Sequence, residues 1–596
     1  MHMHLCTLLY MYSSYGVTYL TDDGRNNNRE HPEWGAASTP RIRRFPALRR
    51  NDHDDDDERQ QQLPSARRVM EELFRTARPH KDKKVNHLLL EFGHFIVQDL
   101  LGSAHNQTDA MPIPCDGTLA DFVFCPVTGR SGSRSMDFYR NTHTNDDGAR
   151  RSINGMTSFL DLSNLYGLDQ TSSQRMRAPR GKLLMTNDDD PADEALLPDG
   201  TKNGMNTSPG AFCFYVLFMR YHNHVADQLV VLHGHNSDNS NGNNNNSMTD
   251  EQIFQRARQK TIAVYQSWVE EAYLPTLLGD KLDPYPGYDP TVDPSIDEFF
   301  AAVAFRYAHT NLGAAIRVLD SAFSPAPEDP IFLRDVFKQN VPGLVRRLGG
   351  VEPFLRGLVV APAKAMDASF VDDLNVWSES TTVLDVQRGR DVGIPPYNDV
   401  REAFGLARIT SLEELAQNDT VVLEALRSLY QQEIHLVDAY VGAILEPPLT
   451  SLDHMGPVLT MSLKEQFARL RDGDRFWYKH IYDKEEYEAF PGVSELIKLV
   501  CEGMDLFPND PFLLVSSDVP AAASAGGCAA SEGAVANNQL VFLEGDFVVQ
   551  WQIDQADPKD ADSEETIFVT LTVLSLIHIS EPTRLRRISY AVFCLK

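Results

Sequence analysis

The stretch LDVQRGRDVGIPPYNDVREAFGL, residues 384–406, sets a dense group of charges inside an otherwise apolar part of the chain. Seven consecutive positions include Asp385, Arg388, Arg390 and Asp391. Burying so many charges without partners would cost a large free energy. The stretch therefore predicts a partner for these side chains in the folded protein.

The strongest candidate for a ligand-binding residue is a histidine in the earlier segment FFAAVAFRYAHTNL, residues 299–312. A histidine on an apolar helix is more often a core residue than a metal ligand, so His309 alone decides nothing. Arg306 lies three residues earlier, on the same face of the expected helix, where a cation could meet an acidic group of whatever His309 binds. Together with the charged stretch, this favours a ligand-binding histidine.

The periodicity of apolar residues predicts a mainly α-helical chain. Before residue 538 we expect no alternating strands, whereas two later segments, 547–553 and 566–572, are rich in β-branched and aromatic residues and predict short strands. The segments expected to be helical are 66–77, 85–101, 211–231, 250–278, 296–312, 420–445 and 462–471.

Composition excludes some classes of function. Asp and Glu number 84 against 55 Lys and Arg, a formal charge of −29 over 596 residues, so a nucleic-acid partner is not expected. The longest purely apolar run, 211–219, is about half of what a bilayer-spanning helix requires, so no transmembrane segment is expected.

The charged stretch resembles the proximal signature of the animal-type haem peroxidases, the peroxidase–cyclooxygenase superfamily with peroxidasin-like and peroxinectin-like members. Further blocks follow the order of that family over about 500 residues. They are DDGRNNNREHPEWGAASTPRIRRFP (22–46), LPSARRV (63–69), MDFYR (136–140), INGMTSFLDLSNLYG (153–167), RYHNHVADQL (220–229), FRYAHT (305–310) and EQFARLRDGDRFWYKH (465–480). The resemblance implies one large, mainly α haem peroxidase domain.

On the proximal side, the resemblance implies a haem b whose iron is held by His309. The second ring nitrogen of such a ligand needs an acceptor, and Asp385 stands where the family has Asn. An ionised Asp385 would give His309 imidazolate character and favour the ferric state. Arg306 and Arg388 match family arginines near the haem propionates, with structural ion pairing as the alternative.

The resemblance also implies a calcium site. Its ligands would be Asp99 and, from the loop TSFLDLS, Thr157, the Phe159 carbonyl, Asp161 and Ser163. Such a set of hard oxygen atoms is what calcium takes.

The distal helix departs from the family, whose peroxidases carry Gln and, four residues later, the catalytic His. Here the order is His94 and then Gln98. Peroxide must lose one proton and receive another on the leaving oxygen, which an amide cannot mediate. Either His94, on the same helical face, reaches peroxide from a displaced position, or the protein binds haem and activates peroxide poorly.

Further departures concern the haem linkages of mammalian members. Val97 replaces an ester-forming Asp, and one alignment puts Thr207 and Gly204 where those members have the ester-forming Glu and the distal Arg. The spacing from Pro209 to Arg220 instead resembles that of the cyclooxygenases. With the first alignment, the haem is non-covalent.

The function implied is a peroxidase that uses hydrogen peroxide to oxidise small-molecule or halide donors, with a role in the response to oxidative stress. Fatty-acid dioxygenases of the superfamily carry a radical-forming Tyr where this chain has Arg306, and Tyr307 is one residue off and should face elsewhere. A catalytically weak haem- and calcium-binding protein for adhesion or structure is a third interpretation. The donor and the oligomeric state are not readable from the sequence.

The composition of the linker and the resemblances of the other parts together predict five segments. They are an N-terminal extension (1–15) that we interpret as truncated, the haem peroxidase domain (16–514), an Ala/Ser/Gly-rich linker (515–538), a partial β segment like the start of a DOMON module (539–574) and a tail like translated adaptor sequence, expected outside the fold (575–596). For the compartment, only the family resemblance favours an extracellular or luminal site.

Overall fold

The chain was analysed as a computed structural model. The structure describes residues 19–46, 63–75, 81–102, 105–114, 135–146, 149–186, 190–191, 207–235, 247–337, 340–375, 380–448, 454–505, 507–513, 539–544, 547–554, 567–575 and 588–595.

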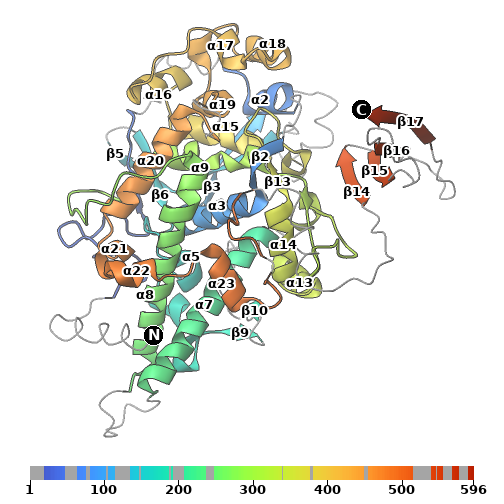
Figure 1. Ribbon diagram of the computed structural model, residues 1–596. Coiled ribbons are helices and arrows are strands. Elements are labelled where there is room, and N and C mark those ends of the chain that lie inside the picture. Colours follow the sequence, from blue (N-terminus) through green and yellow to red (C-terminus); the bar gives the residue numbers. More distant parts are fainter. Residues whose placement is uncertain are drawn as a thin grey trace. The chain divides into compact units, whose positions relative to one another are not determined.

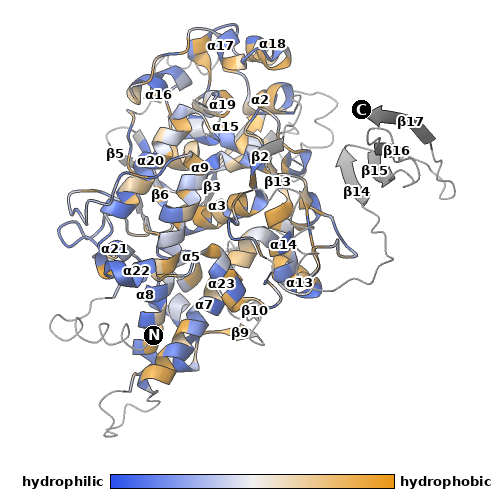
Figure 2. Ribbon diagram, viewed as in Figure 1, coloured by the Kyte–Doolittle hydropathy of each residue, from blue (hydrophilic) through white to orange (hydrophobic). Residues whose placement is uncertain are grey.

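The chain divides into two compact units, residues 1–520 and 521–596. The first is built mainly from helices, which confirms the predicted mainly α class, and the described part of the second is a small sheet (Figure 1). In Figure 2 most helical ribbons mix orange and blue residues, as helices with one buried and one exposed face do. The five predicted segment boundaries stay predictions.

Helix α3 (His87–Leu100) lies near the middle of the first unit, with α14 (Glu352–Val360) and α7 (Pro209–His233) against it (Figure 1). The Asn86 side chain accepts hydrogen bonds from the amides of Leu88 and Leu89 and so starts the helix. Asn86 also donates to the carbonyls of Val359, Pro511 and Leu513, which ties the start of α3 to distant segments. The predicted helix 85–101 is therefore confirmed within two residues.

Two long helices, both predicted from the apolar pattern, pack beside α3. Ser208 caps α7 by accepting from the amide of Ala211, and Pro209 stands at the first helical position. Thr249 and Gln252 form a capping box at the start of α8 (Asp250–Trp268), which continues through a π-helical turn, η6 (Val269–Tyr273), into α9 (Leu274–Leu278).

The segment around His309 differs from the predicted continuous helix 296–312. It forms α10 (Glu298–Ala302), the 3-10 turn η7 (Ala304–Arg306) and α11 (Ala308–Asn311). The break lies at Val303, with φ −125° and ψ −67°, and the Arg306 side chain donates to the freed Ala301 carbonyl at 3.0 Å. Arg306 ends the 3-10 turn and His309 lies in the separate short helix α11, so the prediction of one continuous helix was wrong.

Strands do occur before residue 538, where we expected no alternating ones. Short antiparallel pairs close loops of the first unit, for example β3 (His105–Pro114) with β4 (Ser135–Asn141), and β13 (Pro362–Lys364) with β2 (Lys81–Asn86). One sheet has three strands, in the order β1 (Thr39–Pro40), β6 (Ala149–Asn154) and β5 (His143–Asp146). Most of these strands are short or carry many charges, so the alternation that marks a half-buried strand is missing.

The other helical elements of the first unit are α2 (Ala66–Val69), η2 (Met70–Phe74), α5 (Ser163–Tyr166), α6 (Gln170–Arg175), η3 (Pro179–Gly181), α12 (Leu333–Val336), α13 (Val341–Arg347), η8 (Asp372–Asn375), α15 (Thr381–Asp391), α16 (Tyr397–Ala403), α17 (Leu412–Ala416), α18 (Thr420–Leu429), η9 (Ile434–Leu436), α19 (Ala439–Leu445), α20 (Pro457–Asp472), α21 (Tyr478–Ile481), α22 (Lys484–Glu488) and α23 (Val493–Val500). The other strands of this unit are β1 (Thr39–Pro40), β5 (His143–Asp146), β6 (Ala149–Asn154), β7 (Arg177–Ala178), β8 (Lys182–Leu183), β9 (Met185–Thr186), β10 (Asp190–Pro191), β11 (Ala315–Ile316) and β12 (Ile331–Phe332).

The second unit contains a four-stranded antiparallel sheet in sequential order. Its strands are β14 (Gln539–Glu544), β15 (Phe547–Asp554), β16 (Ile567–Ser575) and β17 (Ile588–Leu595). The two predicted strands correspond to β15 and β16. Strand β17 comes from the segment 575–596, whose interpretation as an adaptor-like tail stays a prediction.

Among the residues that the structure describes, no helix combines the length and the apolar character needed to cross a bilayer.

Candidate functional site

Helix α3 is buried along almost its whole length, except on one side. Only His94, Val97 and Gln98 are partly exposed between Leu88 and Leu100, and their spacing of three and four residues puts them on one face. The His94 side chain retains 30% of its accessible surface. This face is therefore the side of α3 that solvent can reach.

Gln98 makes three hydrogen bonds that fix its amide. Its carbonyl oxygen accepts from the Tyr215 hydroxyl at 2.9 Å, and its nitrogen donates to the Thr207 hydroxyl at 2.5 Å. The same nitrogen lies 3.1 Å from Nε2 of His94. Because the amide nitrogen is a donor, Nε2 of His94 is the acceptor and carries no proton.

The other ring nitrogen of His94 faces a buried acid from the same helix. His94 Nδ1 lies 3.3 Å from Oε2 of Glu91 and 3.3 Å from the Ser208 hydroxyl, which itself donates to Glu91 at 2.7 Å. Burial alone would raise the pKa of Glu91, but its hydrogen bonds with His94 and Ser208 lower it. Glu91 is thus a carboxylate.

On the proximal side, the structure brings three of the predicted residues together. His309 Nδ1 lies 2.6 Å from Oδ2 of Asp385, and Nη1 of Arg388 donates to Oδ1 of Asp385 at 2.7 Å. Tyr440 also donates to Asp385, at 3.1 Å. Burial would raise the pKa of Asp385, but the His309 charge and hydrogen bond, followed by the Arg388 charge, lower it.

Arg306 and Arg388 lie close enough for their charges to act on one another. Burial, and then the Arg388 charge, lower the pKa of Arg306 to about 9. Arg306 gives its Nε hydrogen to Ala301, and Arg388 gives one hydrogen to Asp385, so each guanidinium keeps further donors. Two partly exposed cations that repel one another favour an anionic partner beside them.

These donors fit a haem. His309 has one nitrogen held by a carboxylate, and among the described residues no hydrogen bond reaches its Nε2, which is the arrangement a haem-iron ligand requires. Thr381, Leu384 and Arg388, at spacings of three and four on α15, are partly exposed between buried neighbours. They add a mixed apolar and cationic wall, suited to a flat ring with carboxylate side chains.

Four of the five residues predicted to bind calcium form one buried cluster. Asp161 Oδ1 accepts from the Thr157 hydroxyl and from the Ser163 amide, both at 2.9 Å. The Ser163 hydroxyl donates to Oδ1 of Asp99 at 3.2 Å. The fifth, Phe159, lies in the same loop and is fully buried.

The chemistry of this cluster fits a cation. Burial raises the pKa of Asp161 to about 7, and burial together with the Asp161 charge raises that of Asp99. Oδ2 of Asp161 is buried without a hydrogen-bond partner. Only two of the five predicted calcium ligands are carboxylates, and the described residues hold no group of three or more His, Cys, Asp or Glu placed for a metal.

Other residues of the distal and proximal sites were not predicted from the sequence. Glu91, Ser208, Tyr215 and Tyr440 act through contacts that only the fold creates. Glu91 alone had a signal, as an acid inside an apolar helix three residues before His94. Thr207 contacts Gln98, and Gly204 lies outside the described residues.

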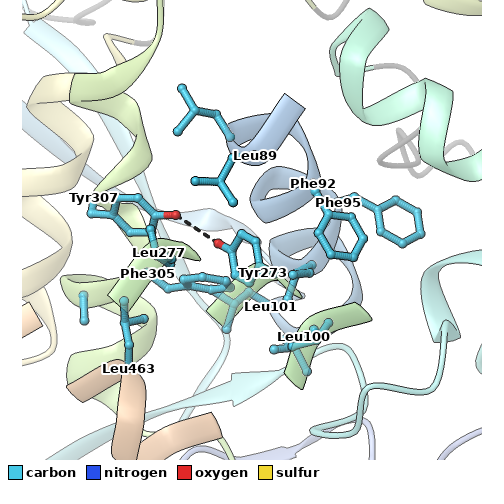
Figure 3. Packing of buried hydrophobic residues seen from close by; sticks show 14 of the residues in the cluster. Leu89, Phe92, Phe95, Leu100, Leu101, Tyr273, Leu277, Phe305, Tyr307 and Leu463 are labelled. Carbon is cyan, nitrogen blue, oxygen red and sulfur yellow. Dashed lines mark hydrogen bonds between the residues drawn. The ribbon is translucent and has the colours of Figure 1, made fainter. Parts of the chain in front are cut away.

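Tyr307 does face away from this site. Its hydroxyl lies 2.9 Å from that of Tyr273, and both rings sit among buried apolar side chains such as Phe305 and Leu277 (Figure 3). The phenol of Tyr307, two residues before His309, is therefore engaged in an internal hydrogen bond.

Comparison with known proteins finds peroxidases among the relatives of this chain. Thyroid peroxidase of Sus scrofa is 28% identical over 569 residues, covering 82% of this chain and 60% of that protein. The peroxidasin homolog of Mus musculus is 28% identical over 556 residues, covering 82% and 36%. The chain thus spans less than two thirds of the length of these relatives.

Solved structures share the fold. Peroxidase A of Dictyostelium discoideum superposes with a TM-score of 0.72 at 23% identity, covering 83% of this chain and 99% of that one. The fatty acid alpha-dioxygenase of Oryza sativa gives 0.69 at 18% identity, covering 85% and 90%. The sequence model described as animal haem peroxidase matches residues 19–507. The chain belongs to the animal haem peroxidase family.

Proposed function

We propose that this protein is a haem-dependent peroxidase that uses hydrogen peroxide to oxidise small-molecule or halide donors. The observation that carries the proposal is the contact of 2.6 Å between His309 Nδ1 and a buried, ionised Asp385 in a chain of this family. The haem would be a non-covalently bound haem b. A location outside the cell or in a lumen, and a role under oxidative stress, belong to the same proposal.

A bound haem would supply the iron that takes up the oxidising equivalents of peroxide. His309 would hold it through Nε2, because Asp385 keeps Nδ1 as the donor. Arg388 and Tyr440 orient Asp385 from two further directions and keep it charged. Arg306 and the remaining donors of Arg388 would pair with the haem carboxylates.

On the distal side, we propose that His94 moves the protons. Its Nε2 would accept a proton from peroxide and return it to the leaving oxygen, the two tasks that a titrating side chain performs. In the structure, Nε2 is covered by the amide of Gln98. Peroxide must therefore displace this amide before His94 can act, which would slow the reaction.

We further propose that Asp99, Thr157, the Phe159 carbonyl, Asp161 and Ser163 hold calcium. The unpartnered oxygen of Asp161 and the mutual repulsion of two buried carboxylates support a cation at this position. Since Asp99 follows Gln98 on α3, the ion would brace the distal helix from behind its catalytic face.

The covering of His94 by Gln98 also favours a second candidate, a haem- and calcium-binding protein with weak catalysis and an adhesive or structural role. A fatty-acid dioxygenase is favoured less, although the fold is shared. Arg306 stands where such enzymes carry the radical-forming Tyr, and Tyr307 is bonded to Tyr273.

Mixing the ferric protein with hydrogen peroxide in a stopped-flow spectrometer tests the proposed function. We expect the Soret band to shift to that of an oxidised haem, slowly or incompletely, and to return when a phenol or halide donor is added. A Soret band that does not respond to peroxide would support the second candidate. A response at ordinary peroxidase speed that survives His94→Ala would contradict the role of His94.

A further inference from the structure

Glu91 is an acidic residue in an otherwise apolar part of α3. It is 6% exposed, and its neighbours Leu88, Leu89, Leu90, Phe92 and Phe95 are buried apolar residues. Placing a carboxylate there costs free energy that packing alone does not recover. Its partners therefore indicate why it is there.

Those partners are not the usual ones of a structural ion pair. Among the described residues, the hydrogen bonds to the Glu91 carboxylate come from Ser208 at 2.7 Å and His94 at 3.3 Å, with no Arg or Lys. A Cβ on Gly210 would run into the Glu91 side chain, so the first turn of α7 leaves room for it. That turn also carries the positive end of the α7 dipole.

The contact of Gln98 with Nε2 of His94 determines which ring nitrogen carries the hydrogen. Tyr215 donates to the carbonyl of Gln98, which turns the amide nitrogen of Gln98 toward Nε2 of His94. Neutral imidazole carries one hydrogen, which is therefore on Nδ1 and is donated to Glu91. Nε2 is left as the basic atom.

We propose that Glu91 is a positioning residue for the distal base, fixing the His94 ring and stabilising the charge that His94 gains when Nε2 takes a proton. This inference rests on the proposed function, because it assigns the base of that same site. A carboxylate beside one ring nitrogen makes the other nitrogen a stronger proton acceptor. Glu91 would compensate for the displaced position of His94.

Cyanide binding to the ferric holoprotein tests the role of Glu91 without turnover. Hydrogen cyanide loses its proton as cyanide binds ferric iron, and we expect His94 Nε2 to accept that proton. In Glu91→Gln we expect association to be slower at neutral pH by about tenfold to a hundredfold, the usual worth of a hydrogen bond to a charged group. The pH at which the rate is half-maximal should also fall, because the imidazolium loses its counter-charge.

Other groups act on Glu91 and belong in the interpretation of the pH profile. They are His87 on the same helix and the thiol of Cys213 on α7, whose pKa burial raises, so that it stays neutral. Glu352→Gln is a matched control, because it removes a carboxylate from neighbouring helix α14 that pairs with Arg220 rather than with His94. We expect its profile to equal that of the natural protein.

The outcomes separate the two claims. Natural protein that binds haem and cyanide, together with an unchanged rate and pH profile in Glu91→Gln, would overturn the role of Glu91 alone. Natural protein that takes up no haem would overturn the proposed function and this inference with it. If Glu91→Gln does not fold, Glu91→Asp keeps the charge but withdraws it from Nδ1, and an unchanged rate there would equally overturn the inference.

Discussion

Gln98 covers Nε2 of His94, the atom that we propose accepts a proton. Its amide is held by Tyr215 and Thr207, so it stays on Nε2 of His94 unless these bonds break. A short side chain at position 98 would uncover the base, and a histidine there would add a second one at the position that the family uses.

Replacing Gln98 by His should accelerate the reaction of the ferric protein with peroxide. General acid–base catalysis contributes about 10²- to 10⁴-fold, and we expect at least the lower part of that range. The second-order rate constant from the Soret band measures it. Gln98→Leu removes the cover without adding a base and separates the two effects, and a rate unchanged in both variants would contradict the covering role of Gln98.

For single residues, the sequence predicted which side chains belong to the proximal site better than it predicted their contacts. His309, Asp385 and Arg388 were predicted as a group, and the structure brings them within hydrogen-bonding distance. Glu91 and Tyr440 were missed, because a single sequence does not show which side chains the fold turns toward a site. Roles in haem and calcium binding stay predictions for all of these residues.

Among the elements, α3 connects the two proposed metal sites. His94 and Gln98 lie on its open face, whereas Asp99 points to the loop of Thr157 and Asp161. The periodic pattern predicted α3, α7 and α8 well, because each has one long apolar face. It failed around Val303, where a local hydrogen bond from the Arg306 side chain to the Ala301 carbonyl replaces helical bonding.

Calcium should stabilise the protein more at pH 7.5 than at pH 5. The pKa of Asp161 is raised to about 7 and that of Asp99 is raised too, so the ion-free fold favours their protonated forms. A carboxyl with a raised pKa gives stability that is complete below its unfolded pKa of about 4 and is lost as pH rises through the folded value. Calcium needs the ionised forms and restores that stability.

Thermal unfolding with calcium or with a chelator measures this effect. An ion at about 100 times its Kd adds about 2.7 kcal/mol, enough for a shift in Tm of a few degrees. Asp161→Asn should abolish the shift, whereas Asp474→Asn, a change at another buried acid whose pKa is raised to about 6, should keep it. A shift equal at both pH values would argue against these ligands.

For the whole molecule, the length of 596 residues resolves into one large helical unit and a small C-terminal unit. The resemblance carried by eight sequence blocks predicted the family, which the match over residues 19–507 confirms. The strands of the first unit were not predicted, because most of them span only two or three residues, which leaves no periodicity to detect.

Haem uptake by the whole chain tests the central claim most directly, that His309 holds a haem. Titrating haem-free protein with haemin should give one tightly bound haem per chain with the Soret band of a histidine-ligated ferric haem. His309→Ala should abolish stable binding, while His224→Ala, a change on α7 at a histidine bonded to Gln228, should not alter it. Stoichiometric haem with an unaltered spectrum in His309→Ala would contradict the account.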